Sequence, residues 1–409
     1  MVELASINDC CGCAACVDSC NQGAIELIED RNGFYFPKVN DTQCVNCGKC
    51  IRACHILNPI KKVRTDYKTN PYAAWSLDEE ILKKSASGGI FAQVAYNFLK
   101  QEGAFVYGAS ILEDSSVHHI EISSGNDLWR LLNSKYQQSN CTGIYKKVKE
   151  RLKHGSYVLF SGTPCEIAAL YIYLGNNKNL IEHLYTIEVI CHGVPSNKIH
   201  RMGLKYSGAK RIVSYRTKSQ GWLNSNRLVY DFGKDGIKEC SNRREDFIFR
   251  SYLSFFMFFY RKSCSKCPYA SIHRVADLTL GDYWGYDKKK YENYYGVSLV
   301  LVNSFKGEAL FCDAENINQI PTTWAECLPH NQNLFMPTNK YLFIASDYIH
   351  SIEKLPDIIK KFIFQNGFSN RLLDRLYTKL FNIATTGIRK KKQEEINRRA
   401  QKAIQEVSV

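Results

Sequence analysis

The sequence predicts a small α+β module at the N-terminus, followed by an α/β domain with an antiparallel insertion and a helical C-terminus. Three observations lead to this prediction. Cysteines crowd the first 58 residues, strand-like and helix-like segments alternate from Tyr72 onward, and the last segments have amphipathic helical patterns. The expected boundaries are 1–58 for the module, 59–71 for a linker, 72–345 for the α/β domain and 346–409 for the helical, basic C-terminal region.

Two cysteine runs organise the N-terminal module. They extend from Cys10 to Cys20 and from Cys44 to Cys54, and both have the spacing Cys-x2-Cys-x2-Cys-x3-Cys. In such runs three thiolates bind one [4Fe-4S] cluster, and the fourth binds the other cluster. The module is therefore expected to be ferredoxin-like. The expected ligands are Cys10, Cys13, Cys16 and Cys54 for the first cluster, and Cys44, Cys47, Cys50 and Cys20 for the second.

Two alternatives to clusters fit these runs less well. Zinc ribbons use paired Cys-x2-Cys motifs rather than runs of four. A disulfide knot needs an oxidising compartment. One departure from bacterial ferredoxins is visible, because Asn21 and His55 stand where a proline usually follows the fourth cysteine. Cys11 is left over and is expected to be a bystander thiol.

Composition and charge narrow the function classes. The chain of 409 residues has 17 cysteines and a net charge of +14, and residues 388–402 hold seven of its Lys and Arg. The other basic residues are scattered and form no recognised nucleic-acid motif, so we expect no nucleic-acid partner. No apolar run is long enough to span a membrane, and no secretory signal is visible. Cysteine use without an export signal predicts a cytoplasmic protein.

Turn and strand patterns predict a hairpin within the module and a linker after it. Residues 25–27 alternate like a strand, residues 30–33 supply a turn, and residues 34–36 return as a second strand. Residues 59–71 are polar, basic and bounded by prolines, which indicates a linker.

The α/β domain is expected to alternate strands and helices. Strands are predicted at 72–76, 104–111, 157–160, 184–190 and 297–302, and helices at 79–84, 90–101, 127–133, 144–153 and 167–174. An antiparallel insertion is expected at 211–240, with strands at 212–217 and 227–232 and a turn at 233–236, and an aromatic helix is expected at 247–259. A helix at 371–383 precedes a basic terminal helix, which is either solvated or docked on a membrane surface.

Two polar segments are candidate cofactor loops. Residues 85–89, Ser-Ala-Ser-Gly-Gly, open a predicted helix, whose N–H groups and positive dipole end suit a phosphate or a flavin edge. The alternative is an ordinary helix start with glycines for close packing. Residues 134–139 include Lys135 and form either a surface loop or a cofactor-contacting one.

Four further cysteines are candidate ligands. Cys165 and Cys191 follow two successive predicted strands, at the edge where α/β sheets bind ligands. Cys264 and Cys267 form a Cys-x2-Cys-Pro motif. The four thiols could hold a third cubane cluster. The alternative is a partly structural set in which Cys165 is a buried or catalytic thiol. His192 could be a ligand, although such a histidine is more often part of a loop.

The ordered set of these motifs resembles the coenzyme F-420 hydrogenase/dehydrogenase beta-subunit family over residues 1–330. The motifs are Ser85-Ala86-Ser87-Gly88-Gly89, Gly162-Thr163-Pro164-Cys165, Cys191-His192-Gly193-Val194, Cys264-x2-Cys267-Pro268, and residues 276–285 with the sequence ADLTLGDYWG. The resemblance implies FAD in the α/β domain, with Ser87, Gly88, Gly89, Lys135 and Gln137 as contacts, and a third cluster at Cys165, Cys191, Cys264 and Cys267.

The resemblance also implies a function. Similar proteins pass electrons or hydride between flavin and a deazaflavin coenzyme, and some bacterial ones are encoded with surface-polysaccharide genes. We therefore expect an iron–sulfur flavoprotein oxidoreductase. It would pass electrons between a redox partner, such as ferredoxin or another subunit, and a small-molecule hydride acceptor or donor. That molecule would be the deazaflavin coenzyme or a biosynthetic intermediate. The alternatives are a non-catalytic electron-transfer subunit and, less in keeping with the motifs, an iron–sulfur nucleic-acid-binding protein.

Overall fold

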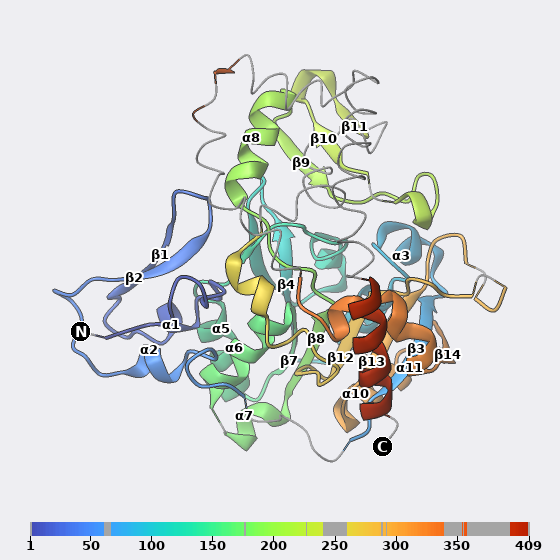
Figure 1. The fold of residues 1–409 in the computed structure, drawn as a ribbon, viewed down its shortest axis with the longest axis horizontal. Helices are drawn as coiled ribbons and strands as arrows, with labels where there is room; N and C mark the ends of the chain where they lie inside the picture. Colours follow the sequence, from blue (N-terminus) through green and yellow to red (C-terminus); the bar gives the residue numbers. More distant parts are fainter. Residues whose placement is uncertain are drawn as a thin grey trace.

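The computed structural model describes residues 2–60, 67–175, 177–225, 227–239, 260–287, 289–291, 293–338, 354, 356–357 and 393–407. The helices expected at 247–259 and 371–383 lie outside these residues. A mixed sheet of nine strands forms the centre of the molecule, and the N-terminal module packs beside it (Figure 1).

The N-terminal module is a hairpin flanked by two single helical turns. Its elements are α1 (Ala15–Asp18), β1 (Ile25–Glu29), β2 (Tyr35–Val39) and α2 (Lys49–Arg52). The two strands pair antiparallel, as predicted. The carboxylate of Asp30 accepts hydrogen bonds from the N–H groups of Asn32 and Phe34, at 3.0 and 2.9 Å, and so fixes the turn. The fourth cysteine of each run follows a helical turn.

The large sheet has a parallel centre and antiparallel margins. Its strand order is β14 (Ile317–Pro321), β3 (Asn70–Ser76), β13 (Ser298–Val302), β12 (Leu278–Asp282), β8 (Leu184–Val189), β7 (Tyr157–Gly162), β4 (Ala104–Ile111), β5 (Val117–Ile122) and β6 (Ser139–Asn140). Strands β12, β8, β7 and β4 run parallel. The central strands are mostly apolar, as burial on both faces favours, and every residue of β13 is buried.

Helices cover both faces of this sheet. One face packs on α5 (Ile144–Lys153), α6 (Pro164–Leu174) and α7 (Lys178–Glu182), and Ala14 and Ala15 of the module join that core. The other face packs on α4 (Ile90–Phe98) and α10 (Phe305–Cys312). Three other helices are α3 (Glu79–Lys84), α8 (Asn197–Ser207) and α11 (Trp324–Cys327). The module therefore shares a hydrophobic core with the larger domain.

A separate three-stranded antiparallel sheet occupies residues 211–239. It consists of β9 (Arg211–Ser214), β10 (Val229–Asp231) and β11 (Ile237–Glu239), with a turn at Gly233–Asp235. It packs with α8 through Leu204, Ile212 and Tyr230, at the top of Figure 1.

Several elements differ from those the sequence predicts. The segment expected as a helix at 127–133 is a 3-10 helix, η1 (Gly125–Arg130), and α4 ends at Phe98 rather than near Gln101. Strand β5 was not predicted, because its sequence Val-His-His-Ile-Glu-Ile does not alternate between apolar and polar residues. One of its polar residues, His119, is buried. Strand β14 and helices α8 and α10 were also missed.

Residues 393–407 form a helix that packs against the domain. Its buried residues are Ile396, Ala400 and Ala403, and the last of these joins a cluster with Ile272 and Leu328. The apolar side that membrane docking would use therefore faces the protein. No helix among the described residues is long and apolar enough to cross a membrane.

Candidate iron–sulfur and cofactor site

The first cysteine run closes around a small apolar pocket. Cys10, Cys13, Cys16 and Cys54 line this pocket together with Leu4, Ala5, Leu27 and Pro37. Burial raises the pKa of the Cys16 thiol to about 12, and the nearby Cys10 and Cys54 raise it further. Four thiols that share one dry pocket are a donor set that suits a cubane cluster.

Three of the four thiols expected to bind the second cluster lie close together. Burial raises the pKa of Cys50, and the neighbouring Cys20 and Cys44 add to this rise. Cys47 is exposed. Cys20 thus lies with the second run and Cys54 with the first. This exchange of the fourth cysteine is what a two-cluster module requires.

Backbone N–H groups and a glycine support the first loop. The Gly12 N–H donates to Cys10 Sγ at 3.4 Å, and the Ala24 N–H donates to Cys20 Sγ at 3.3 Å. Such hydrogen bonds favour charged sulfur. Gly12 has a φ of 70°, and a Cβ there would lie 2.8 Å from the Tyr35 carbonyl oxygen, so a side chain would not fit.

The other four candidate cysteines lie together past the ends of β7 and β8. Cys165 and Cys191 follow these two parallel strands, so both lie at one sheet edge. The Arg261 N–H donates to the Val194 carbonyl at 2.8 Å and brings the segment that carries Cys264 and Cys267 alongside. Burial raises the pKa of Cys191 well above its usual value, and Cys264, Cys165 and Cys267 each contribute. The structure thus brings these four partly buried thiols into one group, which we call the third cysteine group.

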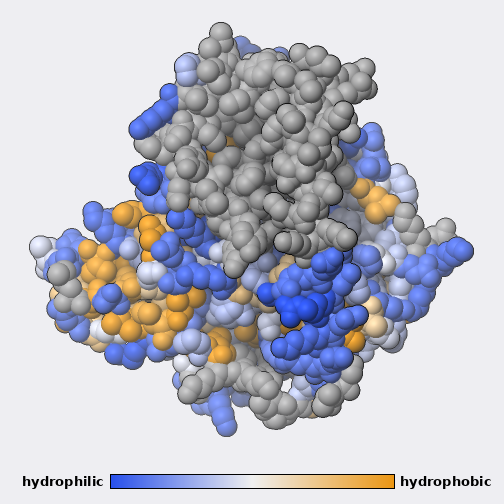
Figure 2. All heavy atoms as spheres, viewed as in Figure 1, coloured by the Kyte–Doolittle hydropathy of each residue, from blue (hydrophilic) through white to orange (hydrophobic). Residues whose placement is uncertain are grey.

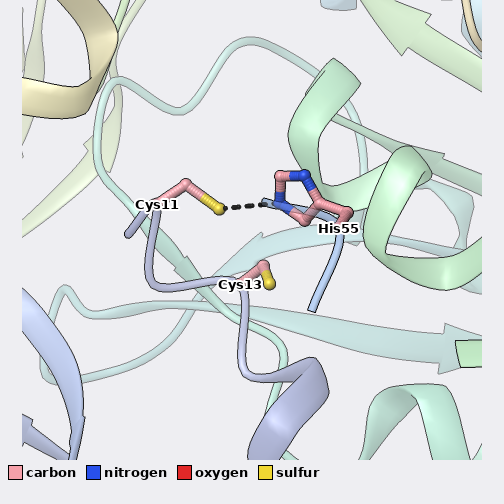
Figure 3. Close-up of side chains that lie close together, drawn as sticks. All are labelled: Cys11, Cys13 and His55. Carbon is pink, nitrogen blue, oxygen red and sulfur yellow. Dashed lines mark hydrogen bonds between the residues drawn. The ribbon is translucent and has the colours of Figure 1, made fainter. Parts of the chain in front are cut away.

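Cys11, expected to be a bystander, lies at the junction between the first run and the third cysteine group. Its Sγ lies 3.1 Å from Nε2 of His55, and Cys13 is beside them (Figure 3). The Cys11 thiol also contacts that of Cys165. On its other side, His55 pairs through Nδ1 with the Tyr269 hydroxyl at 2.6 Å, and burial lowers its pKa to about 4. A neutral imidazole therefore bridges the two regions.

A large cavity opens beside this junction. Its volume is about 1050 Å³, and Cys11, His55, Cys165, Cys264 and Cys267 line part of its wall. Small molecules could thus approach the third cysteine group.

Polar contacts hold the module against the domain. Asp18 accepts hydrogen bonds from the N–H groups of Gly143 and Tyr145, at 2.6 and 2.9 Å, and so caps α5 from outside the domain. Gln138 donates to the Cys11 and Gly12 carbonyls at 3.0 Å. Arg261 donates to the Cys10 carbonyl at 3.1 Å, to the Tyr35 carbonyl at 2.8 Å and to Gln138 Oε1 at 2.7 Å. Loop 134–139 therefore contacts the first cysteine run.

Two of the expected flavin contacts have structural roles. The Ser87 hydroxyl donates to the Val297 carbonyl at 3.0 Å, and the Gly88 N–H donates to Ser298 Oγ at 2.9 Å. A Cβ on Gly88 would lie 2.4 Å from the Ala74 carbonyl oxygen. These contacts agree with the packing interpretation of the motif. Gly89 begins α4 with a φ of 78° and without a side-chain cap, so the first turn of that helix keeps N–H groups that a ligand could use.

Lys135 and Gln137 differ in whether their side chains are free to form a hydrogen bond with a cofactor. The Lys135 ammonium donates to the Leu131 and Leu132 carbonyls, at 2.8 and 2.6 Å, and burial lowers its pKa to about 7. Gln137 Oε1 is buried and makes no hydrogen bond with the described residues.

Sequence reasoning missed a buried polar cluster between loops 85–89 and 134–139. Lys218 donates to the carbonyls of Leu82 and Ser87, and burial lowers its pKa to about 7. Arg216 lies 2.8 Å from Asp282, and Trp222 donates to the same carboxylate at 3.0 Å. Asp282 ends β12 at the edge that also carries Cys191. The signal in the sequence was the Gly281-Asp282 pair within the motif at 276–285.

Two family models match parts of the chain. Residues 9–56 match the model of the 4Fe-4S dicluster domain, so the molecule is an iron–sulfur protein of the redox class. Residues 155–326 match the model for the C-terminal part of the coenzyme F420 hydrogenase/dehydrogenase beta subunit. This match confirms the expected resemblance to that family, within residues 155–326.

One solved structure and the curated proteins complete the comparison. A chain of the F420-reducing [NiFe] hydrogenase complex from Methanosarcina barkeri is 16% identical, with a TM-score of 0.45 over 72% of this chain and 94% of that one. No curated protein matches.

Proposed function

We propose that the protein is an iron–sulfur flavoprotein oxidoreductase with three [4Fe-4S] clusters. The ligands would be Cys10, Cys13, Cys16 and Cys54; Cys44, Cys47, Cys50 and Cys20; and Cys165, Cys191, Cys264 and Cys267. When bound, such clusters carry single electrons, and a flavin couples single electrons to hydride chemistry. The observation that carries the proposal is that Cys11 connects the first run with the third cysteine group. Its thiol lies beside those of Cys13 and Cys165.

We place the flavin, as FAD, at the sheet edge beside the third cysteine group. Gly89, at the uncapped start of α4, and Gln137, whose Oε1 has no hydrogen-bond partner among the described residues, supply polar groups toward it. Ser87, Gly88 and Lys135 would shape the loops around it through their contacts within the protein. The residues at this edge are partly buried, and partial exclusion of water strengthens a hydrogen bond to a cofactor.

The surface around the second run supports a redox partner such as a ferredoxin or another protein of the same complex. Cys47 is exposed, and the neighbouring Val45 is 62% exposed. Ile7, Ile28 and Leu57 of the module are also exposed, and Figure 2 shows hydrophobic residues gathered on the module. An apolar surface next to a redox centre suits a transient protein contact. The small-molecule partner would be a hydride acceptor or donor, either a deazaflavin coenzyme or a biosynthetic intermediate such as one of surface polysaccharide synthesis.

The test uses anaerobically purified full-length protein. Flavin is released from one portion of the protein and quantified. A second, untreated portion is mixed with a reduced ferredoxin and the deazaflavin coenzyme while absorbance is followed. We expect about one FAD per chain and electron transfer that Cys264→Ser abolishes. Cys312→Ser is the matched control, because Cys312 is exposed and lies outside all three groups. Protein with iron and sulfide but no flavin would instead be a non-catalytic electron-transfer subunit.

A further inference from the structure

A second group of potential ligands lies buried behind the proposed cluster cysteines. His119 of β5, Cys141 just after β6 and Glu166 of α6 have donor atoms within 4.8 Å of one another. Their exposed fractions are 4, 0 and 6%. None of the three belongs to the cysteine groups described above. Three residues from distant parts of the sequence thus meet in the core.

The hydrogen bonds of His119 fix its tautomer. Its Nε2 lies 2.9 Å from the carbonyl oxygen of Ser161, which can only accept, so Nε2 carries the proton. Nδ1 therefore presents its lone pair, 3.2 Å from Cys141 Sγ and 2.7 Å from the Ser139 hydroxyl. Metal-binding histidines commonly donate their other ring N–H to a backbone carbonyl in this way.

The group also lacks a compensating positive charge. Within the described part of the chain, Glu166 forms no ion pair with Lys or Arg. Its Oε2 accepts one hydrogen bond, from the Thr163 N–H at 2.7 Å, as part of the capping box of α6. The Tyr145 hydroxyl is beside the Cys141 thiol, and Tyr145 is fully buried, yet this hydroxyl makes no hydrogen bond of regular geometry with the described residues. A buried carboxylate and an unpartnered hydroxyl are costly, and a cation would relieve both.

We propose that His119 Nδ1, Cys141 Sγ and a Glu166 carboxylate oxygen bind one Zn²⁺, with the Tyr145 hydroxyl or a water as fourth ligand. Zinc accepts this mixture of nitrogen, sulfur and oxygen in tetrahedral geometry, with bonds of about 2.0–2.3 Å. A tetrahedron of that size separates its donors by about 3.3–3.8 Å, and the 3.2 Å between Cys141 Sγ and His119 Nδ1 is close to the lower end of that range. The ion would join β5, the turn between β6 and α5, and α6, and so support the helix that begins beside Cys165.

Zinc content and zinc coordination test this proposal independently of the iron clusters. Full-length protein is purified anaerobically from zinc-supplemented cells, metals are counted by mass spectrometry, and zinc K-edge absorption is recorded. We expect about one zinc per chain, with one sulfur at ~2.3 Å and nitrogen or oxygen at ~2.0 Å. Absence of zinc would overturn the proposal. Zinc surrounded by sulfur alone would also overturn it, because that ion would lie in a cysteine cluster site.

Two variants locate the ion. His119→Gln and Cys141→Ser are each expected to lose the zinc and to keep the wild-type iron content. Cys327→Ser is the matched control, because Cys327 is equally buried but lies in a different core cluster. Zinc retained in a folded His119→Gln protein would overturn the assignment. Should Cys141→Ser not fold, the absorption spectrum of the wild type still decides the question. Iron content unchanged by zinc loss separates this proposal from the three-cluster proposal.

Discussion

The cap that Asp18 places on α5 offers a direct test of how the module is held. Helix α5 begins at Gly143, which supplies no side-chain cap, and the Asp18 carboxylate accepts from the N–H groups of Gly143, Tyr145 and Lys146, at 2.6, 2.9 and 3.3 Å. Losing an N-cap costs about 1–2 kcal/mol, and an acidic group at a helix N-terminus adds about 0.3–1 kcal/mol. For Asp18→Ala we expect a local loss of about 2 kcal/mol, which is roughly a 30-fold change in an opening equilibrium.

Amide hydrogen exchange measures this loss where it occurs. In the anaerobic holoprotein, the amides of Gly143 and Tyr145 should exchange about 30-fold faster in Asp18→Ala. Asp18→Asn, which keeps an acceptor oxygen, should show a smaller change. Asp78→Ala is the matched control, because Asp78 caps α3 by accepting from the Glu80 and Ile81 N–H groups. Its effect should be confined to α3. Unchanged exchange at Gly143 in Asp18→Ala would refute the cap.

Three further predictions concern buried groups. Arg274→Met should lower the free energy of unfolding by about 3–5 kcal/mol, and with it the thermal midpoint, because it leaves the fully buried Glu188 unpaired. Adding Glu188→Gln should recover much of this loss, and a double variant without recovery would contradict the explanation. Burial lowers the pKa of His200 to about 3, so the unfolded state alone binds a proton below pH 6.5. Between pH 6.5 and 5.5, the free energy of unfolding measured with urea should therefore fall by about 1 kcal/mol more for the wild type than for His200→Gln. Equal losses in the two proteins would exclude His200 as the cause. Gly88→Ala should destabilise by about 1–3 kcal/mol, since its Cβ would meet the Ala74 carbonyl; a neutral effect in the same assay would argue against tight packing there.

The parts of the site that sequence reasoning anticipated are local in the chain. Each cysteine run spans eleven residues, and its spacing alone predicts which thiols share a cluster. The grouping of Cys165 with Cys191 followed from strand order, because the ends of parallel strands meet at one edge. The hairpin and the parallel strands β4, β7 and β8 were likewise predicted from strand and turn patterns.

The parts that sequence reasoning missed depend on contacts between distant residues. Arg216 and Lys218 are charged residues that a pattern places at the surface, yet both are buried through partners far along the chain. His119 was missed because β5 has no apolar alternation. The position of Cys11 at the junction depends on His55 and Cys165. Both are distant in sequence and lie beside Cys11 only in the folded structure.

Iron and sulfide content of the anaerobic holoprotein tests the central claim most directly. Three cubane clusters predict about twelve irons and twelve sulfides per chain, and Cys165→Ser should reduce each to about eight. A wild-type protein that holds only eight irons, unchanged in Cys165→Ser, would contradict the claim that the third cysteine group carries a cluster.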